Sequence, residues 1–425
     1  MPWSLPAAGR SPLRRLAARG HALLRREVVP ARHRRGAALV VVLLTIAILT
    51  TVIIDFVYQT RVQLHMAVNQ RDEVRAYFLA RSGMDLARLA LGFQRQVSQL
   101  GAGINIQIWQ YLNQFMGAFN AGRVDLPVAS VDLSSVKGLG QIKGAFDVDI
   151  EPQDGKINLG SLAVPPTDQG GARARLETIA RLTVLMSPGE HKELFEQKDG
   201  QGQYNDIPEI IAALIDWVDV DADLTTMSGD GVYLPTGPGQ EANRYRKVGA
   251  KVKPRNMKPD TLLELHRVKG IGDDFFSRFG ESLTIYPTSK INVNTANEQM
   301  LAVLICSYVR NPMDPLCNDP FLLELSALVL QVRMYQQLRR GIFMMTPFQT
   351  VSQFSGFLRS GKPEWGFQVS KPPDLNWAEL EKAIEVRPPA IYQIKAEGRI
   401  ANTTKTLVAV IDLNKKGKLY YWREF

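Results

Sequence analysis

The strongest constraint on this chain is an uncharged apolar run of 18 residues, Ala37–Ile54, with the sequence AALVVVLLTIAILTTVII. As an α-helix such a run rises about 27 Å, close to the roughly 30 Å hydrocarbon core of a bilayer. The rest of the 425-residue sequence contains no second apolar run of this length. We therefore predict a single-pass membrane helix followed by a large folded body.

The basic residues are concentrated before this run. Residues 1–35 hold nine of the 51 lysines and arginines but one of the 42 acidic residues, which leaves 42 basic and 41 acidic residues in the remainder. Arginine-rich flanks stay on the cytoplasmic side of a membrane. The asymmetry predicts a cytoplasmic N-terminus, an anchor in the inner membrane and a nearly neutral periplasmic body, which argues against nucleic acid as a partner.

The helix is expected to continue beyond the membrane. Residues 55–93 contain no proline, and apolar residues recur there at three- and four-residue spacing, which is typical of one helical face. A continuous helix from Ala37 to about Phe93 would be roughly 85 Å long. The residues predicted to form its apolar face are Val74, Tyr77, Ala80, Met84, Ala87 and Leu91.

Strand patterns lie on both sides of a mostly helical region. Residues 144–150 alternate apolar and polar side chains, and a turn is expected at Asp154-Gly155, after which a strand resumes at residues 156–159. The C-terminal residues alternate again, over 392–400, 406–413 and 419–422. If these strands pair with the earlier ones, everything between them is an insertion into one sheet of an α+β fold.

The acidic stretch 216–223 is the clearest candidate metal site. Asp219, Asp221 and Asp223 have the spacing of positions 1, 3 and 5 of a calcium loop, and hard cations prefer carboxylate oxygens. The pattern departs from an EF-hand at position 6, which is Leu224, and at position 12, which is Asp230. A solvated acidic loop is the alternative.

The two cysteines, Cys306 and Cys317, both lie in the predicted periplasmic body. An oxidising compartment and ten intervening residues make a disulfide a reasonable expectation, and two buried thiols are the alternative. The sequence around them has neither a CxxC motif nor a nearby histidine pair, so a zinc site is not expected.

Two segments resemble parts of helix-hairpin-helix proteins. Residues 268–272, VKGIG, lie between two helical patterns, and glycine amides in such a hairpin are able to hold a phosphate. Residues 291–296, INVNTA, precede an apolar helix, and Thr295 with Glu298 predicts a capping box. A structural hairpin is the favoured interpretation, and a membrane-anchored DNA receptor of a competence system is the alternative.

Enzyme motifs are missing from the sequence. Only His191 and His266 lie in the body beyond the membrane-proximal His65, and neither has a nucleophile motif nearby. The sequence also contains no Walker loop and no G-x-S-x-G motif. We therefore expect no enzymatic activity.

The junction Arg35-Gly36-Ala37 resembles the type IV prepilin signal, in which a basic leader ends in glycine at the start of an apolar helix. The resemblance implies that a prepilin peptidase cleaves between Gly36 and Ala37 and methylates the new amino terminus. Most pilin-like proteins have glutamate as the fifth mature residue, whereas that position here is Val41. In this departure the sequence resembles the minor pseudopilin K family of type II secretion systems, whose members lie at a filament tip.

Further segments resemble landmarks of that family in the same order along the chain, namely residues 154–162, 214–219, 239–241, 265–270 and 291–296. The resemblance implies a type IV pilin-like fold with a large SAM-like, helix-hairpin-helix-like insertion. It also implies a tip role in protein secretion, with minor pseudopilins I and J, the major pseudopilin and an inner-membrane assembly platform as partners. Structural calcium is expected, with candidate ligands Asp216, Asp219, Asp221, Asp223 and Glu241.

These expectations divide the chain into six segments. They are a prepilin leader (1–36), a transmembrane half-helix (37–54), a pilin-like helix with the first strands (55–165), a helical insertion with the acidic loop (166–290), a second helical part (291–385) and C-terminal strands (386–425).

Overall fold

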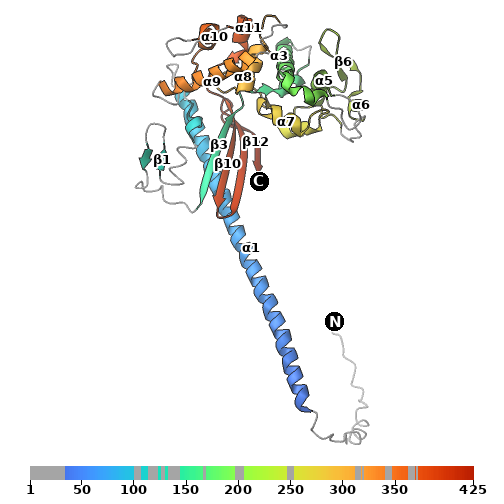
Figure 1. Ribbon diagram of the computed structural model, residues 1–425, viewed down its shortest axis with the longest axis vertical. Helices are drawn as coiled ribbons and strands as arrows, with labels where there is room; N and C mark the ends of the chain where they lie inside the picture. The colour runs from blue at the N-terminus through green and yellow to red at the C-terminus, as the bar shows by residue number, and fades with distance from the viewer. Residues whose placement is uncertain are drawn as a thin grey trace, which may run out of the picture. The chain divides into compact units, whose positions relative to one another are not determined.

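The computed structural model describes residues 34–99, 107–112, 123–125, 130–132, 144–165, 169–196, 205–246, 253–311, 317, 320–339, 347–361, 369 and 372–425. The chain forms two compact units, Met1–Gln70 and Arg71–Phe425. Within the second unit, the helices gather beyond one end of an antiparallel sheet (Figure 1). The six segment boundaries expected from the sequence stay predictions.

One helix, α1 (Arg34–Gln99), contains the apolar run. Its residues 36–67 are all exposed, and its most apolar 18-residue window has a mean hydropathy of 3.0 with none of the window buried. By length and composition, α1 is able to cross a membrane. The predicted uninterrupted helix is confirmed, and it begins and ends a few residues outside the predicted limits.

In the second unit, residues 71–96 of α1 pack on a four-stranded antiparallel sheet. The strand order of this sheet is β12-β11-β10-β3. Helix α1 forms one layer and the sheet the other, with a shared apolar core between them. The strands are β3 (Ala145–Pro152), β10 (Ile391–Ile400), β11 (Thr403–Asp412) and β12 (Lys418–Glu424). The predicted pairing of the C-terminal strands with the earlier strand is confirmed, because β10 pairs with β3 from Tyr392 opposite Pro152 to Arg399 opposite Ala145.

Small residues allow α1 to lie close to this sheet. A Cβ atom on Gly398 of β10 would lie 2.1 Å from the carbonyl oxygen of Ala76, so only glycine fits there. Ala80, like Ala76, is fully buried. The predicted apolar face is right at Ala80, Met84, Ala87 and Leu91, whereas Val74 is 51% exposed because the buried face passes through Ala76 instead.

The chain between β3 and β10 forms a separate helical core in the same unit. Among its described residues, the helices of seven residues or more are α3 (Gln169–Met186), α5 (Ile207–Val218), α7 (Asp273–Phe279), α8 (Glu298–Cys306), α9 (Pro320–Arg339), α10 (Val351–Ser360) and α11 (Trp377–Ala383). Two short parallel strand pairs join segments that are distant in the sequence. Strand β4 (Ile157–Asn158) pairs with β7 (Leu283–Thr284), and β8 (Ile291–Asn292) pairs with β9 (Ile384–Glu385).

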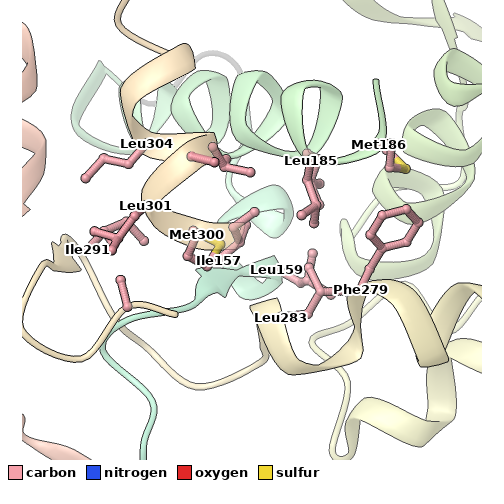
Figure 2. Close-up of a cluster of buried hydrophobic side chains, with 14 of the residues drawn as sticks. Ile157, Leu159, Leu185, Met186, Phe279, Leu283, Ile291, Met300, Leu301 and Leu304 are labelled. Atoms are coloured by element: carbon pink, nitrogen blue, oxygen red, sulfur yellow. The ribbon is translucent and has the colours of Figure 1, made fainter. Parts of the chain in front are cut away.

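Apolar side chains from these segments meet in one cluster. Figure 2 shows Ile157 and Leu159, which follow β3, beside Leu283, Met300 and residues of the surrounding helices. This cluster is distinct from the one between α1 and the sheet. The expected α+β, pilin-like fold with a large helical insertion is therefore confirmed.

Two local expectations differ from the structure. The predicted strand at residues 156–159 is reduced to β4, because the turn at Asp154-Gly155 directs the chain out of the sheet and into the helical core. The predicted capping box is also wrong, since α8 is capped by Asn297, whose side chain accepts a hydrogen bond from Met300 N at 2.8 Å. Thr295 instead donates to the carbonyl of Asn292.

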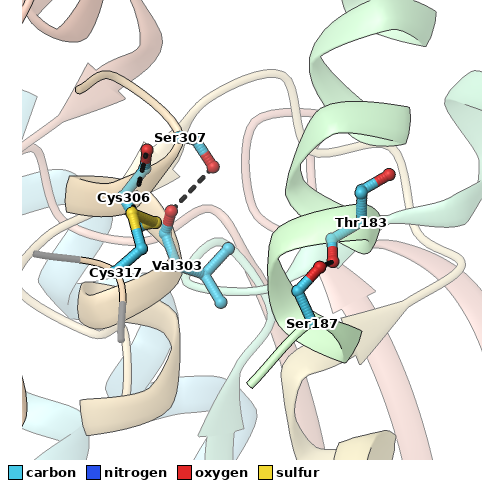
Figure 3. Close-up of a disulfide and its surroundings, with 6 residues drawn as sticks. All are labelled: Thr183, Ser187, Val303, Cys306, Ser307 and Cys317. Atoms are coloured by element: carbon cyan, nitrogen blue, oxygen red, sulfur yellow. Dashed lines mark hydrogen bonds between the residues drawn. A yellow bond between two sulfur atoms is a disulfide. The ribbon is translucent and has the colours of Figure 1, made fainter. Parts of the chain in front are cut away.

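Cys306 and Cys317 form a disulfide with a Cα–Cα distance of 5.5 Å (Figure 3). Cys306 is the last residue of α8, and Cys317 lies between the described residues 311 and 320. The bond therefore ties the end of this buried helix to Cys317, three residues before α9 begins. Such a covalent closure limits the conformations of the unfolded chain.

The buried Asp154 joins the sheet to the helical core. Its Oδ2 accepts hydrogen bonds from Ala390 N at 2.8 Å and Ile391 N at 3.2 Å, and its carbonyl oxygen accepts one from Asn292 N at 2.9 Å. Burial raises the pKa of Asp154 to about 7, and Glu385 adds to the shift while the two amides oppose it. Asp154 thus exchanges a proton near neutral pH at the point where the two cores meet.

The variant Asp154→Asn is expected to gain stability relative to the natural chain as pH rises. The carboxyl has a higher pKa in the folded than in the unfolded protein, so the folded state holds the extra proton between these values and loses stability as pH rises through them. The asparagine does not titrate. The difference in unfolding free energy should change by roughly 2–3 kcal/mol in favour of the variant between about pH 5 and pH 8.

Urea unfolding of the full chain in detergent at both pH values measures this difference. Asp147→Asn is the matched control, because Asp147 lies on β3, the strand just before the Asp154 turn, and its side chain is 60% exposed. A free-energy difference for Asp154→Asn that is the same at both pH values would contradict the prediction.

Candidate metal centre

Helix α5 places the first candidate ligand. All of its residues from Ile210 to Val218 are buried, so the residue that follows, Asp219, is held inside the protein with 6% of its surface exposed. The amide of Asp219 closes the helix by donating to the carbonyl of Ile215 at 2.9 Å. The apolar character of α5 therefore forces a carboxylate into a buried position.

A two-stranded hairpin returns the chain to the same place. Strands β5 (Leu224–Met227) and β6 (Tyr233–Gly237) are antiparallel, and they bring Glu241, the first residue of α6 (Glu241–Arg246), back beside the end of α5. The sequence predicts only an acidic loop here, whereas the structure forms a hairpin. The Asp230-Gly231 pair between two short runs of strand-forming residues was the signal for a hairpin turn.

Three carboxylates meet at this point. One oxygen from each of Asp219, Asp221 and Glu241 lies within 4.8 Å of the others. Glu241 is 2% exposed, whereas Asp221 is exposed at the rim. The group joins the end of α5, the loop after it and the start of α6.

Two of these carboxylates have a buried oxygen without a hydrogen-bond partner, Oδ1 of Asp219 and Oε1 of Glu241. A buried ionised carboxylate without a partner is costly, and proteins normally supply a hydrogen bond or a cation. Each of the two oxygens belongs to a residue of the three-carboxylate group. This pair of unsatisfied oxygens distinguishes the group from a solvated acidic loop.

The electrostatics of the group also indicate a missing positive charge. Burial raises the pKa of Asp219 to about 8, with Asp221 and Asp216 adding to the shift. Burial likewise raises the pKa of Glu241 to about 8, and the same acidic neighbours contribute. The guanidinium of Arg175 opposes the rise at Asp219, but a single positive charge does not balance three carboxylates.

The donor set fits a hard divalent cation. Calcium binds oxygen atoms at 2.3–2.6 Å, so ligand oxygens on opposite sides of the ion lie up to about 5 Å apart. The 4.8 Å spread of the three carboxylate oxygens is within this limit. With Arg175 nearby, two further positive charges would neutralise Asp219, Asp221 and Glu241.

The other two candidate ligands are engaged elsewhere. Asp216 is fully buried, forms an ion pair with Arg244, and accepts a hydrogen bond from Thr225 N at 2.9 Å. Asp223 accepts a hydrogen bond from Gly239 N at 3.0 Å, which braces the base of the hairpin. The structure thus brings together three of the five expected ligands and gives Asp216 and Asp223 structural roles.

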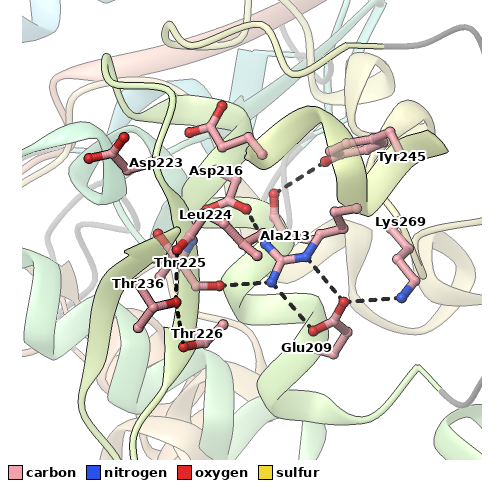
Figure 4. Close-up of polar contacts among 12 residues, drawn as sticks. Glu209, Ala213, Asp216, Asp223, Leu224, Thr225, Thr226, Thr236, Tyr245 and Lys269 are labelled. Carbon is pink, nitrogen blue, oxygen red and sulfur yellow. Dashed lines mark hydrogen bonds and ion pairs between the residues drawn. The ribbon is translucent and has the colours of Figure 1, made fainter. Parts of the chain in front are cut away.

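Asp216 belongs to a buried network that sequence reasoning missed. Arg244 contacts Asp216, the carboxylate of Glu209 at 3.1 Å and the carbonyl of Thr225 at 2.8 Å, and Lys269 approaches Glu209 at 3.0 Å. Figure 4 shows Glu209 and Asp216, both from α5, and Lys269, which reaches Glu209 from a later segment of the chain. Its two carboxylates and two cations balance, so this network needs no further ion.

The pKa shifts agree with that balance. Burial raises the pKa of Asp216 to about 6, although Arg244 opposes the rise. Burial would also raise the pKa of Glu209, but Arg244 and Lys269 outweigh it and lower this pKa below its usual value. Glu209 is therefore held ionised, between two cations.

The glycine hairpin at residues 268–272 packs on α5. Gly270 has a φ of 80°, and a Cβ atom there would lie 2.8 Å from Cγ1 of Ile210. Lys269 is directed to Glu209 of the same helix. These contacts favour the structural interpretation of the hairpin over the phosphate-binding one.

Comparisons with known proteins add one finding. No family model and no curated protein matches the sequence. A solved structure described as the GspK-GspI-GspJ complex from the type 2 secretion system of enterotoxigenic Escherichia coli is similar, with a TM-score of 0.48 and 15% identity, covering 86% of this chain and 99% of that chain. Its description names the family that the sequence motifs resemble.

Proposed function

We propose that this chain is a minor pseudopilin of a type II secretion system that initiates or caps the pseudopilus from its tip. The observation that carries the proposal is α1 itself. One unbroken helix has an exposed, uncharged first part and a second part that packs through alanine and glycine on an antiparallel sheet. This division suits a subunit that is held in a membrane before assembly and contributes the same helix to a filament afterwards.

The start of α1 supports processing by a prepilin peptidase. Gly36 is followed directly by the apolar run, so cleavage after it would leave Ala37 as a mature amino terminus ready for methylation. In pilin-like subunits a glutamate at the fifth mature position neutralises the amine of a neighbouring subunit. Val41 has no charge to offer, and a subunit at the tip has no subunit above it to match.

The helical insertion supports the same position in the filament. It separates β3 from β10 and has its own apolar core, so it is a second folded layer added at one end of the sheet. A second layer of this size would prevent another subunit from stacking on that end. The partners we propose are the minor pseudopilins I and J, with the major pseudopilin and the inner-membrane platform during assembly.

The ion that fits the three-carboxylate group is calcium, which would join α5, its following loop and α6 as a structural element. Asp219, Asp221 and Glu241 would hold it. Calcium would supply the positive charge that these buried oxygens lack, without taking part in any reaction. We propose no active site for this protein.

The variant Gly36→Val is expected to leave the precursor uncut in cells that contain the prepilin peptidase, because a β-branched side chain at the cleavage position blocks the peptidase. Intact mass of the membrane-extracted protein distinguishes a chain beginning at Met1 from one beginning at Ala37. Gly92→Val is the control, since a Cβ atom at Gly92 meets nothing within 4 Å and the position is remote from the junction. A normal mature mass for Gly36→Val would reject the prepilin interpretation.

Co-purification tests the position in the filament. The natural chain is expected to retain minor pseudopilins I and J after detergent extraction. A DNA receptor, the alternative suggested by the two helix-hairpin-helix-like segments, would instead bind duplex DNA with steep salt dependence. Tight, salt-sensitive DNA binding together with no retained pseudopilin would favour the receptor.

A further inference from the structure

The short segment 253–258 contacts the three-carboxylate group through Asn256. Its central residue, Asn256, has a φ of 54°, in the left-handed region that few side chains other than glycine and asparagine adopt. The segment belongs to neither α6 nor the 3₁₀ turn Leu262–Arg267 that follows. The position is therefore open to few other residue types.

Asn256 contacts each of the three parts of the candidate metal centre. Its backbone N donates to the carbonyl of Trp217, in the last turn of α5, at 3.1 Å. Its side-chain Nδ2 donates to Oε2 of Glu241 at 2.9 Å and to the carbonyl oxygen of Asp221. One residue thus holds the end of α5, the acidic loop and the start of α6.

The bond to Glu241 has a directional consequence. Oε2 is occupied by the amide of Asn256, whereas Oε1 has no partner and belongs to a group with Asp219 and Asp221. A carboxylate fixed through one oxygen presents the other in a defined direction. Partners that orient a metal ligand in this way contribute strongly to affinity.

We propose that Asn256 is a positioning residue of the cation site, whose amide fixes Glu241 and the Asp221 main chain so that Oε1 of Glu241 faces the ion. This inference rests on the cation site proposed above. Asparagine suits the position for two reasons. It tolerates the left-handed backbone, and its amide donates hydrogen bonds without adding charge to an already acidic group.

A calcium titration of the full chain in detergent tests the proposal. Bound ion is first removed with a chelator, and the titration is followed by calorimetry. Asn256→Gly is compatible with the left-handed backbone and removes the side chain that carries the amide, so it is expected to weaken calcium binding roughly 10-fold or more. The matched control is Ala401→Gly, which makes the same kind of change at a left-handed residue (φ 49°) in the turn between β10 and β11. Its calcium affinity should equal that of the natural chain.

Asn256→Asp provides the second test, because it has the same shape but cannot donate to Glu241. Binding weaker than that of the natural chain supports a donor role. Equal or tighter binding overturns it, and tighter binding would place the side-chain oxygen on the ion itself. Natural affinity in Asn256→Gly also overturns the role of Asn256 while the cation site stands. No binding by the natural chain rejects the cation site and the inference with it.

Discussion

Replacing Arg244 with methionine is expected to destabilise the second unit by about 3–5 kcal/mol, because it leaves a fully buried carboxylate without its cation. The side chains of Arg244 and Asp216 are 3% and 0% exposed, so water cannot take over the lost contacts. Glu209 would keep only Lys269 as a cationic partner. Urea unfolding in detergent, monitored by tryptophan fluorescence, measures the loss, since Trp217 lies next to Asp216 in the same buried helix.

Arg173→Met is the matched control for this prediction. Arg173 also pairs with two carboxylates, Glu177 and Glu379, but its side chain is 50% exposed, and exposed ion pairs contribute little to stability. The double variant Asp216→Leu with Arg244→Met should recover part of the loss, because it removes the charge along with its partner. Equal losses in Arg244→Met and Arg173→Met would show that the buried network is not an important source of stability.

The extended elements were predictable because their signals are local. The apolar run and the helical periodicity give α1, and two-residue alternation gives β3, β10, β11 and β12. The order of these elements was then sufficient to expect one sheet interrupted by an insertion. Periodicity reports which face of an element is buried, and burial decides most of the packing in this fold.

The details of the candidate site were not predictable in the same way. The calcium-loop spacing made Asp223 equivalent to Asp219, and the family resemblance added Asp216 from the same acidic stretch. The fold separates them by bringing Arg244, 28 residues later, onto Asp216. Which carboxylates are left for a cation therefore depends on a pairing that no local pattern records.

The same limitation applies to Asn256. An isolated asparagine between Arg255 and Met257 carries no recognisable motif. Its importance comes from its backbone conformation and from contacts with residues 15 to 39 positions earlier. The Asp154-Gly155 turn is an intermediate case. Its local chemistry predicted a turn, but only the structure shows that the turn leaves the sheet and joins two cores.

Calcium is expected to raise the thermal stability of the natural chain, and Asp219→Asn is expected to abolish that effect. An ion present at about 100 times its dissociation constant stabilises the folded state by about 2.7 kcal/mol, or several degrees in the unfolding midpoint. Asp219 supplies a buried, unpaired oxygen to the group, so its loss removes a charged ligand from the ion. Thermal unfolding in excess calcium and in excess chelator, on the full chain in detergent, gives the two midpoints.

Stability in chelator provides a further test, because the buried carboxylates destabilise the folded state when no ion neutralises them. In chelator, Asp219→Asn should be at least as stable as the natural chain, since the amide removes a buried carboxylate that Asp221 and Asp216 repel. Asp230→Asn is the control, as it changes an exposed acid in the β5–β6 turn and should leave the calcium effect intact.

Identical midpoints for the natural chain with calcium and with chelator would exclude a structural ion. A calcium shift that persists in Asp219→Asn would place any ion on other ligands. A site built from unsatisfied buried oxygens requires this reversal. The natural chain is the more stable protein in calcium, and it is no more stable than Asp219→Asn in chelator.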